Sequence, residues 1–133
     1  MGFKTYGVEL SSETASYARN QQNLDVYCGT LDQAHYADGQ FDVVTLWDVL
    51  EHIPEPHTML AEIHRILSSS GLLVIQSPNM DSLMADIGKE NWNWWLVPDH
   101  IYHFTPATLR DLIKVFSLLA FQSIIPGSTL LIF

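Results

Sequence analysis

Apolar and polar residues alternate along the chain in blocks that predict strands separated by helices. Residues 41–47 form the clearest strand, because Val43, Val44 and Leu46 belong to a nearly continuous apolar run, which is typical of a strand covered on both faces. Shorter apolar runs bounded by turn residues predict further strands. They cover residues 4–10, 25–28, 72–75, 121–125 and 130–133.

Helix start signals stand between these strands. Ser11 or Ser12 is placed to cap a helix over residues 13–22. Thr105 followed by Pro106 predicts the N-cap and the first helical position of another helix. That helix would turn an apolar face inward, made of Leu109, Leu112, Ile113 and Phe116.

A further helix is expected from about Pro56, because apolar residues recur there as one helical stripe. The stripe consists of Met59, Leu60, Ile63, Ile66 and Leu67. Gly71 follows three serines and is suited to close this helix as a left-handed cap. Residues 81–99 are expected to form a loop-rich insertion.

Strands that alternate with helices predict an α/β fold with a doubly wound, mostly parallel sheet and helices on both faces. Ligands of such sheets bind beyond the carboxyl ends of the strands. Functional residues are therefore expected just after Leu10, Cys28, Trp47 and Ile75.

Composition narrows the function. The chain has 133 residues, the length of one domain, and a formal net charge of −9. No Lys or Arg lies between Arg19 and Arg65, so the basic footprint that binds nucleic acid is missing. This acidic stretch suits a cationic ligand, or it is a solvated face. The single cysteine, Cys28, and the polar residues that interrupt the uncharged C-terminal stretch favour a cytoplasmic protein without a membrane span.

Several motifs resemble class I S-adenosylmethionine-dependent methyltransferases, in the order and spacing of that family. The stretch 41–54, which reads Phe-Asp-Val-Val-Thr-Leu-Trp-Asp-Val-Leu-Glu-His-Ile-Pro, is the most specific of them. The others are residues 7–11, 29–31, 71–79 and 100–106, of which the last two match the small-molecule branch. The resemblance implies a Rossmann-like fold, S-adenosylmethionine as the cofactor and methyl transfer to a small-molecule acceptor.

The resemblance also implies which residues would hold the adenosine part of the cofactor. Glu9 would accept hydrogen bonds from the ribose hydroxyls, with Leu10 against the adenine. Thr30 and Leu31 would meet the adenine edge, although many relatives carry an acidic residue at the position of Thr30. The alternative for Glu9 is that it is an ordinary carboxylate at a strand end, whose negative charge interacts favourably with the dipole of the following helix.

The same resemblance implies a second group of cofactor contacts after the clearest strand. Trp47 and Asp48 would lie beside the methionine portion, and Val49 would lie beneath the cofactor. A carboxylate and an aromatic face both suit a sulfonium cation. Simple core packing is the alternative reading for Trp47 and Val49.

The expected reaction is an in-line displacement on a methyl group, which depends mainly on alignment. A hydroxyl acceptor would also need a base, and the candidates are His52, His100 and His103. Each of these could instead be a structural or surface histidine. No metal site is expected, because no His-Glu-x-x-His motif occurs and the chain has one cysteine.

Three indoles, Trp92, Trp94 and Trp95, stand within the expected insertion. They are consistent with a lid over an apolar acceptor, with a plug on the sheet end or with an oligomer contact.

One family feature is missing from the sequence. None of the seven glycines forms a Gly-x-Gly turn, and only eight residues precede Glu9. The domain, residues 1–133, is therefore expected to lack its first, mid-sheet strand and also part of its C-terminal end, which leaves an incomplete sheet with two open strand edges. Two functions follow: methyl transfer by an impaired chain, or a non-catalytic methyltransferase-like module that pairs these edges with another chain, including a second copy.

Overall fold

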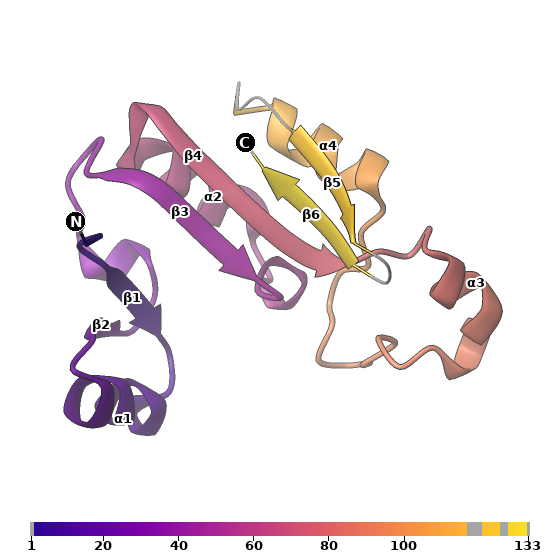
Figure 1. The fold of residues 1–133 in the computed structure, drawn as a ribbon, viewed down its shortest axis with the longest axis horizontal. Helices are drawn as coiled ribbons and strands as arrows, with labels where there is room; N and C mark the ends of the chain where they lie inside the picture. The colour runs from indigo at the N-terminus through magenta and orange to yellow at the C-terminus, as the bar shows by residue number, and fades with distance from the viewer. Residues whose placement is uncertain (1, 117–120, 126–127, 133) are drawn as a thin grey trace. The chain divides into compact units, whose positions relative to one another are not determined.

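The chain folds into two units, residues 1–37 (unit 1) and 38–133 (unit 2), which are described separately below (Figure 1). The computed structural model describes residues 2–116, 121–125 and 128–132. Among these residues, no helix is long and apolar enough to cross a membrane.

Unit 1 is a strand–helix–strand element. Strand β1 (Tyr6–Glu9) pairs in parallel with β2 (Asp25–Cys28), and helix α1 (Ser12–Gln22) connects them. Ser11 is the N-cap predicted for α1, since its side chain accepts a hydrogen bond from the backbone N–H of Thr14 at 3.3 Å. The expected helix and second strand are confirmed, whereas the first strand is shorter than residues 4–10.

Two tyrosines, one of them on β1, pack against each other in unit 1. The rings of Tyr6 and Tyr36 meet edge to face with centroids 5.9 Å apart, and the Tyr36 hydroxyl lies 3.5 Å from the carbonyl oxygen of Gly7. Burial raises the pKa of Tyr36, and the negative charge of Asp25 adds to this effect.

Unit 2 contains a four-stranded sheet with the order β3-β4-β6-β5. Its strands are β3 (Phe41–Trp47), β4 (Leu67–Pro78), β5 (Phe121–Ile125) and β6 (Ser128–Ile132). Strands β3 and β4 are parallel, whereas β6 is antiparallel to both β4 and β5. The α/β class with parallel strand pairs is thus confirmed. Both β1 and β3 are edge strands of their sheets.

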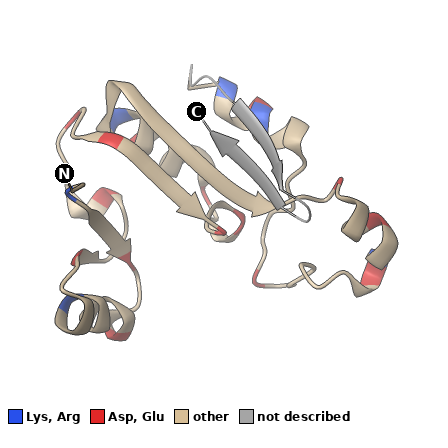
Figure 2. Cartoon of the chain, viewed as in Figure 1, with Lys and Arg blue, Asp and Glu red and all other residues tan. Residues whose placement is uncertain are grey.

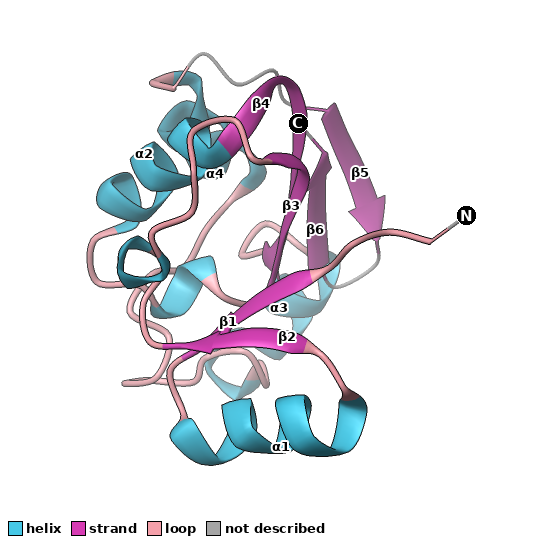
Figure 3. Cartoon of the chain, turned by 90° about the vertical axis from the view of Figure 1, so that its left-hand side faces the viewer, coloured by secondary structure: helices cyan, strands magenta, loops and turns pink. Residues whose placement is uncertain are grey.

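Helices α2 (Pro56–Ile66) and α4 (Pro106–Lys114) lie on one face of this sheet (Figures 1 and 3). The core between them and the sheet is apolar, and its most buried members are Leu60, Ile63, Ile66, Leu73, Ile75, Leu109 and Ile113. Thr105 caps α4 as predicted, because its hydroxyl accepts from the Thr108 backbone while the Thr108 hydroxyl accepts from the Thr105 backbone.

The prediction that Gly71 closes α2 in a left-handed conformation is wrong. Helix α2 ends at Ile66, and the chain becomes extended at Leu67, where β4 begins. A Cβ atom at Gly71 would lie 2.9 Å from Leu67 Cδ2, 3.0 Å from the Ser68 carbonyl oxygen and 3.1 Å from the Phe41 carbonyl oxygen. Glycine is needed here for close approach of the backbone.

The insertion at residues 81–99 is more helical than expected. It contains α3 (Leu83–Gly88), which Ser82 caps by accepting from the Ala85 backbone at 3.1 Å, and a 3₁₀ turn over Lys89–Asn91. The strand expected at residues 130–133 begins earlier, at Ser128, and residue 133 lies outside the described residues.

Acidic side chains outnumber basic ones in both units (Figure 2). Arg65, one of the few basic residues, forms ion pairs with two carboxylates. Its Nε donates to Glu62 at 2.9 Å, and its guanidinium also pairs with Asp38. These two carboxylates raise the pKa of Arg65 above its usual range.

Candidate functional site

The site in unit 2 begins where β3 ends. Asp48 adopts a left-handed backbone conformation with φ of 50°, and its N–H donates to the Gln76 carbonyl oxygen at 2.9 Å. Its carboxylate accepts from the Gln76 side chain at 3.2 Å. This anchor on the neighbouring strand turns the chain sharply into a 3₁₀ turn, η2 (Leu50–His52), so that the side chain of Glu51 enters the protein.

Glu51 is a carboxylate with 1% of its surface exposed. Its Oε2 accepts a hydrogen bond from the Ser77 hydroxyl at 3.0 Å, whereas its Oε1 is buried and has no hydrogen-bond partner among the described residues. Burial is the main cause that raises the pKa of Glu51, and the nearby charge of Asp48 adds to it. The hydrogen bond from Ser77 partly offsets this shift.

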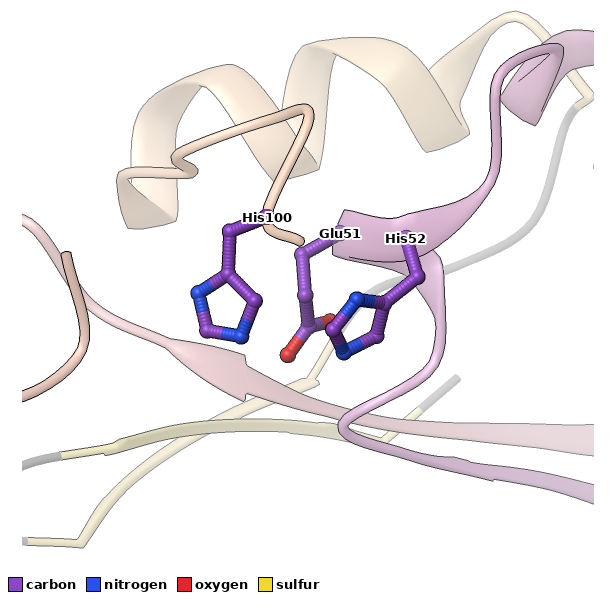
Figure 4. Close-up of side chains that lie close together, drawn as sticks. All are labelled: Glu51, His52 and His100. Atoms are coloured by element: carbon purple, nitrogen blue, oxygen red, sulfur yellow. The ribbon is translucent and has the colours of Figure 1, made fainter. Parts of the chain in front are cut away.

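Two of the predicted histidines flank this carboxylate (Figure 4). One nitrogen of His52, one nitrogen of His100 and one Glu51 oxygen all lie within 4.8 Å of one another. The two rings meet edge to face with centroids 4.7 Å apart. His52 is exposed and His100 is buried, so the cluster reaches from the interior to the surface.

Backbone carbonyls fix both rings. The Nδ1 of His52 lies 2.8 Å from the carbonyl oxygen of Asp99, and the Nδ1 of His100 lies 2.9 Å from that of Trp94. Because a carbonyl only accepts, each Nδ1 donates, and the Nε2 of each neutral ring carries a lone pair. The Glu51 carbonyl oxygen in turn accepts from the backbone of Ile101 at 2.9 Å, which ties the two segments together.

The third predicted histidine lies next to the cluster. The ring centroids of His103 and His100 are 6.0 Å apart, and His103 Nε2 is buried without a hydrogen-bond partner among the described residues. Burial, and then the charge of His100, lower the pKa of His103. The structure therefore brings together the three histidines that were predicted as candidate bases, although His52 is distant in the sequence from His100 and His103.

Tryptophan rings pack against two of these histidines. Trp94 stacks on His100 with ring centroids 6.3 Å apart, and Trp95 contacts His103 at 4.7 Å. Trp92 is buried and meets Trp95 edge to face. Sequence reasoning treated the indoles separately from the histidines and did not assign Glu51. The signal in the sequence is a carboxylate that directly follows Leu50 and directly precedes His52.

The adenosine contacts expected from the sequence lie in unit 1. The Ser11 N–H donates to Glu9 Oε1 at 2.7 Å, which holds the half-buried carboxylate at the end of β1. The Thr30 N–H donates to the Gln33 side chain at 3.0 Å, so it is already engaged. A hydrogen bond between the Thr30 side chain and Asp32 lowers the pKa of Asp32. An acidic group therefore stands beside Thr30, which sequence reasoning missed.

The remaining residues of the expected cofactor set show varied exposure. Leu10 and Trp47 are exposed by 70% and 53%, whereas Leu31 and Val49 are half-buried. Their roles, with those of Glu9, Thr30 and Asp48, stay predictions.

Comparison with known proteins decides the family. A family model described as "Methyltransferase domain" matches residues 1–117. The chain belongs to this methyltransferase family. Among curated relatives, a ubiquinone biosynthesis O-methyltransferase of Maricaulis maris is 32% identical over 115 residues, which cover 80% of this chain and 45% of that protein. An uncharacterised 37.1 kDa transposon protein of Streptomyces fradiae is 33% identical over 87 residues, 62% of this chain and 25% of that protein.

The fold of this methyltransferase-family chain also matches solved structures. A Thermotoga maritima structure, described as an S-adenosylmethionine-dependent methyltransferase and possible histamine N-methyltransferase, superposes with a TM-score of 0.79 at 19% identity, covering 95% of this chain and 70% of that one. This similarity confirms the Rossmann-like fold. The chain spans less than half the length of the two curated relatives.

S-adenosylmethionine is the cofactor of this family, as expected from the sequence. The donor and acceptor groups in unit 1 fit its adenosine part. The Glu9 carboxylate accepts from a single backbone N–H among the described residues, which leaves acceptor capacity for ribose hydroxyls, and Asp32 offers an acceptor beside Thr30.

Proposed function

We propose that this chain binds S-adenosylmethionine and takes part in methyl transfer to a small-molecule acceptor. The observation that carries the proposal is the Glu9 carboxylate at the carboxyl end of a parallel strand, oriented by the Ser11 N–H. Ligands of doubly wound sheets bind at such strand ends, and an acidic residue there accepts from ribose hydroxyls. When bound, the cofactor supplies a methyl group on a positively charged sulfur.

The remaining cofactor contacts are proposed for each unit separately. In unit 1, Leu10 and Leu31 offer apolar contacts to the adenine, and Thr30 offers its hydroxyl. In unit 2, the carboxylate of Asp48 and the exposed ring of Trp47 suit the sulfonium, with Val49 as an apolar contact.

We place the acceptor in unit 2, near the histidines. An open hollow of about 580 Å³ lies against α3, and Leu83, Ala85 and Trp95 contribute to its lining. Trp95 in turn contacts His103, so the hollow lies next to one of the three histidines. A small acceptor is supported by the mixed apolar and polar lining and by the name of the O-methyltransferase relatives.

Catalysis at this site would depend on the position of the acceptor and on removal of its proton. His52 is the exposed member of the three histidines, so we assign it as the ring that an acceptor reaches. His100 and His103 lie behind it and are proposed to hold the polar network in place. A positioned base contributes roughly 10²–10⁴-fold to such a reaction.

We also propose that the chain by itself is a weak catalyst. It has no Gly-x-Gly turn, and both β1 and β3 are edge strands. The alternative function is a non-catalytic module that pairs these edges with another chain, and the exposed side chains of Val43 and Trp47 on β3 favour it. Location in the cytoplasm, a single domain over residues 1–133 and the lack of a nucleic-acid partner belong to the same proposal.

Calorimetric titration of the purified chain with S-adenosylmethionine tests the proposed function. Glu9→Gln removes the charge with little change of shape and should weaken binding by about 10- to 150-fold, because hydrogen bonds to charged groups contribute roughly 1.5–3 kcal/mol. Glu13→Gln is the matched control, since Glu13 is an exposed carboxylate in the first turn of α1. Its affinity should equal that of the unmodified chain.

Light scattering on the same sample separates the two functions. A folded sample that binds no cofactor and has the mass of two or more chains contradicts the proposed function and supports the edge-pairing module. A monomer that binds the cofactor through Glu9 supports methyl transfer.

A further inference from the structure

Glu51, His52 and His100 bring their ligand groups together in unit 2. Glu51 has a buried oxygen, Oε1, without a hydrogen-bond partner among the described residues, and each ring has one nitrogen that is not used for a backbone carbonyl. All three ligand groups lie within 4.8 Å of one another (Figure 4). Among the described residues, no donor is placed to satisfy the Glu51 Oε1 atom, although Glu51 is 99% buried. Converging lone pairs of this kind need a shared proton or a cation.

The surroundings of the rings favour a metal cation. Histidines that bind metals donate their other ring N–H to a carboxylate or a backbone carbonyl, which fixes the tautomer and aims the free nitrogen. His52 and His100 both do so, toward the carbonyl oxygens of Asp99 and Trp94. The Ser77 hydroxyl likewise holds the second oxygen of Glu51. Each of the three groups therefore has the kind of supporting contact that is expected of a metal ligand.

The charge of the site agrees with a cation. Asp48 lies close enough to Glu51 for its charge to act on that carboxylate. Asp48 is itself held by Gln76. A divalent ion would offset the negative charge of Glu51, whose burial makes an unpaired carboxylate costly.

We propose that Glu51, His52 and His100 bind a divalent transition-metal ion of the Zn²⁺ type. Two imidazoles and one carboxylate are a ligand set used for Zn²⁺ and for Fe²⁺. This differs from the sequence-based expectation of no metal site. That expectation rested on the absence of a His-Glu-x-x-His motif and on the single cysteine, whereas here η2 supplies two ligands and a distant segment supplies the third.

The proposed metal refines the proposed function and rests on it. Three protein ligands leave at least one coordination position open, and the exposed His52 lies on the solvent side. A hydroxyl group of an acceptor that takes this position loses its proton to water more readily, because a bound metal lowers the pKa of its oxygen ligands. The acceptor class is therefore an alcohol or a phenol. With the metal bound, His52 and His100 act as ligands, and the metal takes over from His52 the role of favouring loss of the acceptor's proton.

Metal binding is measured on the purified 133-residue chain after removal of metals with a chelator. Zn²⁺ is titrated against a competing indicator, and Co²⁺ is used as a second probe whose visible absorption reports nitrogen and oxygen ligation. Variants are His52→Ala and Glu51→Gln. His57→Ala and His64→Ala are the matched controls, because both histidines lie exposed on α2, outside the cluster.

One equivalent of Zn²⁺ should bind to the unmodified chain and to both controls. Because loss even of a supporting contact costs about 10–100-fold in metal affinity, each ligand variant should lose at least about 100-fold. His52 is exposed, so His52→Ala tests the site in a chain whose circular dichroism should match that of the unmodified protein. No binding by the folded chain, or equal affinity of His52→Ala and the controls, would overturn the metal site.

Titration with S-adenosylmethionine on the same samples keeps the two proposals apart. Loss of metal binding in His52→Ala with unchanged cofactor affinity supports a metal site that is separate from the Glu9 contact. Cofactor binding without metal binding overturns the metal site alone. Metal binding without cofactor binding contradicts the proposed function alone.

Discussion

The hydroxyl of Ser77 donates a hydrogen bond to the carboxylate of Glu51 at 3.0 Å, and each of the two residues is only 1% exposed. Ser77 lies near the end of β4, and Glu51 lies in the 3₁₀ turn that follows β3. The bond therefore joins two neighbouring strand ends through a buried polar contact. Such a contact is costly to remove, because it leaves a buried acceptor without its donor.

Ser77→Ala should lower the free energy of unfolding by about 1–3 kcal/mol, the usual cost of leaving a buried polar group unsatisfied. Urea unfolding followed by circular dichroism measures this change. Ser70→Ala is the matched control, because Ser70 lies on the same strand but is exposed. Equal stability of the two variants would show that the buried contact contributes nothing.

Two substitutions at Ser11 separate its roles as helix cap and as backbone donor. Ser11→Ala removes the side chain that caps Thr14 and should destabilise the chain by about 1 kcal/mol, while its N–H still holds Glu9. Ser11→Pro also removes the N–H, although the Ser11 φ of −73° suits proline. We therefore expect cofactor affinity to fall in Ser11→Pro and to be retained in Ser11→Ala.

Calorimetric titration of both Ser11 variants with S-adenosylmethionine checks this expectation. Similar affinity in the two variants would mean that the orientation of Glu9 by the backbone does not matter for binding.

Gly71→Ala should destabilise unit 2, because the added Cβ would lie 3.0–3.1 Å from two carbonyl oxygens and 2.9 Å from Leu67 Cδ2. Overpacking of this kind typically costs about 1–3 kcal/mol. Gly2→Ala is the control, since nothing lies within 4 Å of the corresponding position. Thermal unfolding of both variants measures the difference, and a Gly71→Ala protein as stable as the control would contradict the close approach.

The fold could be predicted where local signals decide it. The apolar run gave the bounds of β3 to the residue, and the caps at Ser11 and Thr105 gave the starts of two helices. The role of Gly71 could not be predicted, because it depends on how β4 passes the Phe41 carbonyl, where the strand register shifts. That contact exists only once two segments have paired.

The candidate site could likewise be predicted only in part. His52, His100 and His103 were recognisable as candidates by their motifs, but their contact with Glu51 was not. It depends on an apolar strand that buries a carboxylate and on the backbone carbonyls of Trp94 and Asp99. The sequence cannot show which backbone carbonyls will contact a histidine ring, since every residue type has one.

Tyr36 makes the stability of unit 1 depend on pH in the alkaline range. Burial, and then the charge of Asp25, raise the pKa of Tyr36 in the folded state. As the pH rises above about 10, the unfolded chain loses the proton of this tyrosine first, so the native state binds more protons and stability falls with rising pH. Tyr36→Phe removes this titration and should reduce the loss of stability between about pH 9 and pH 11.

Urea unfolding at both ends of this pH range measures the effect. Tyr17→Phe is the matched control, because Tyr17 lies on α1 with 60% of its surface exposed, and this variant should lose as much stability as the unmodified chain. Other groups also titrate in this range, so the informative quantity is the difference between the two phenylalanine variants. If both lose the same stability, the folded environment of Tyr36 does not favour its protonated form, and the packing of Tyr36 against Tyr6 and Gly7 must be looser than the structure shows.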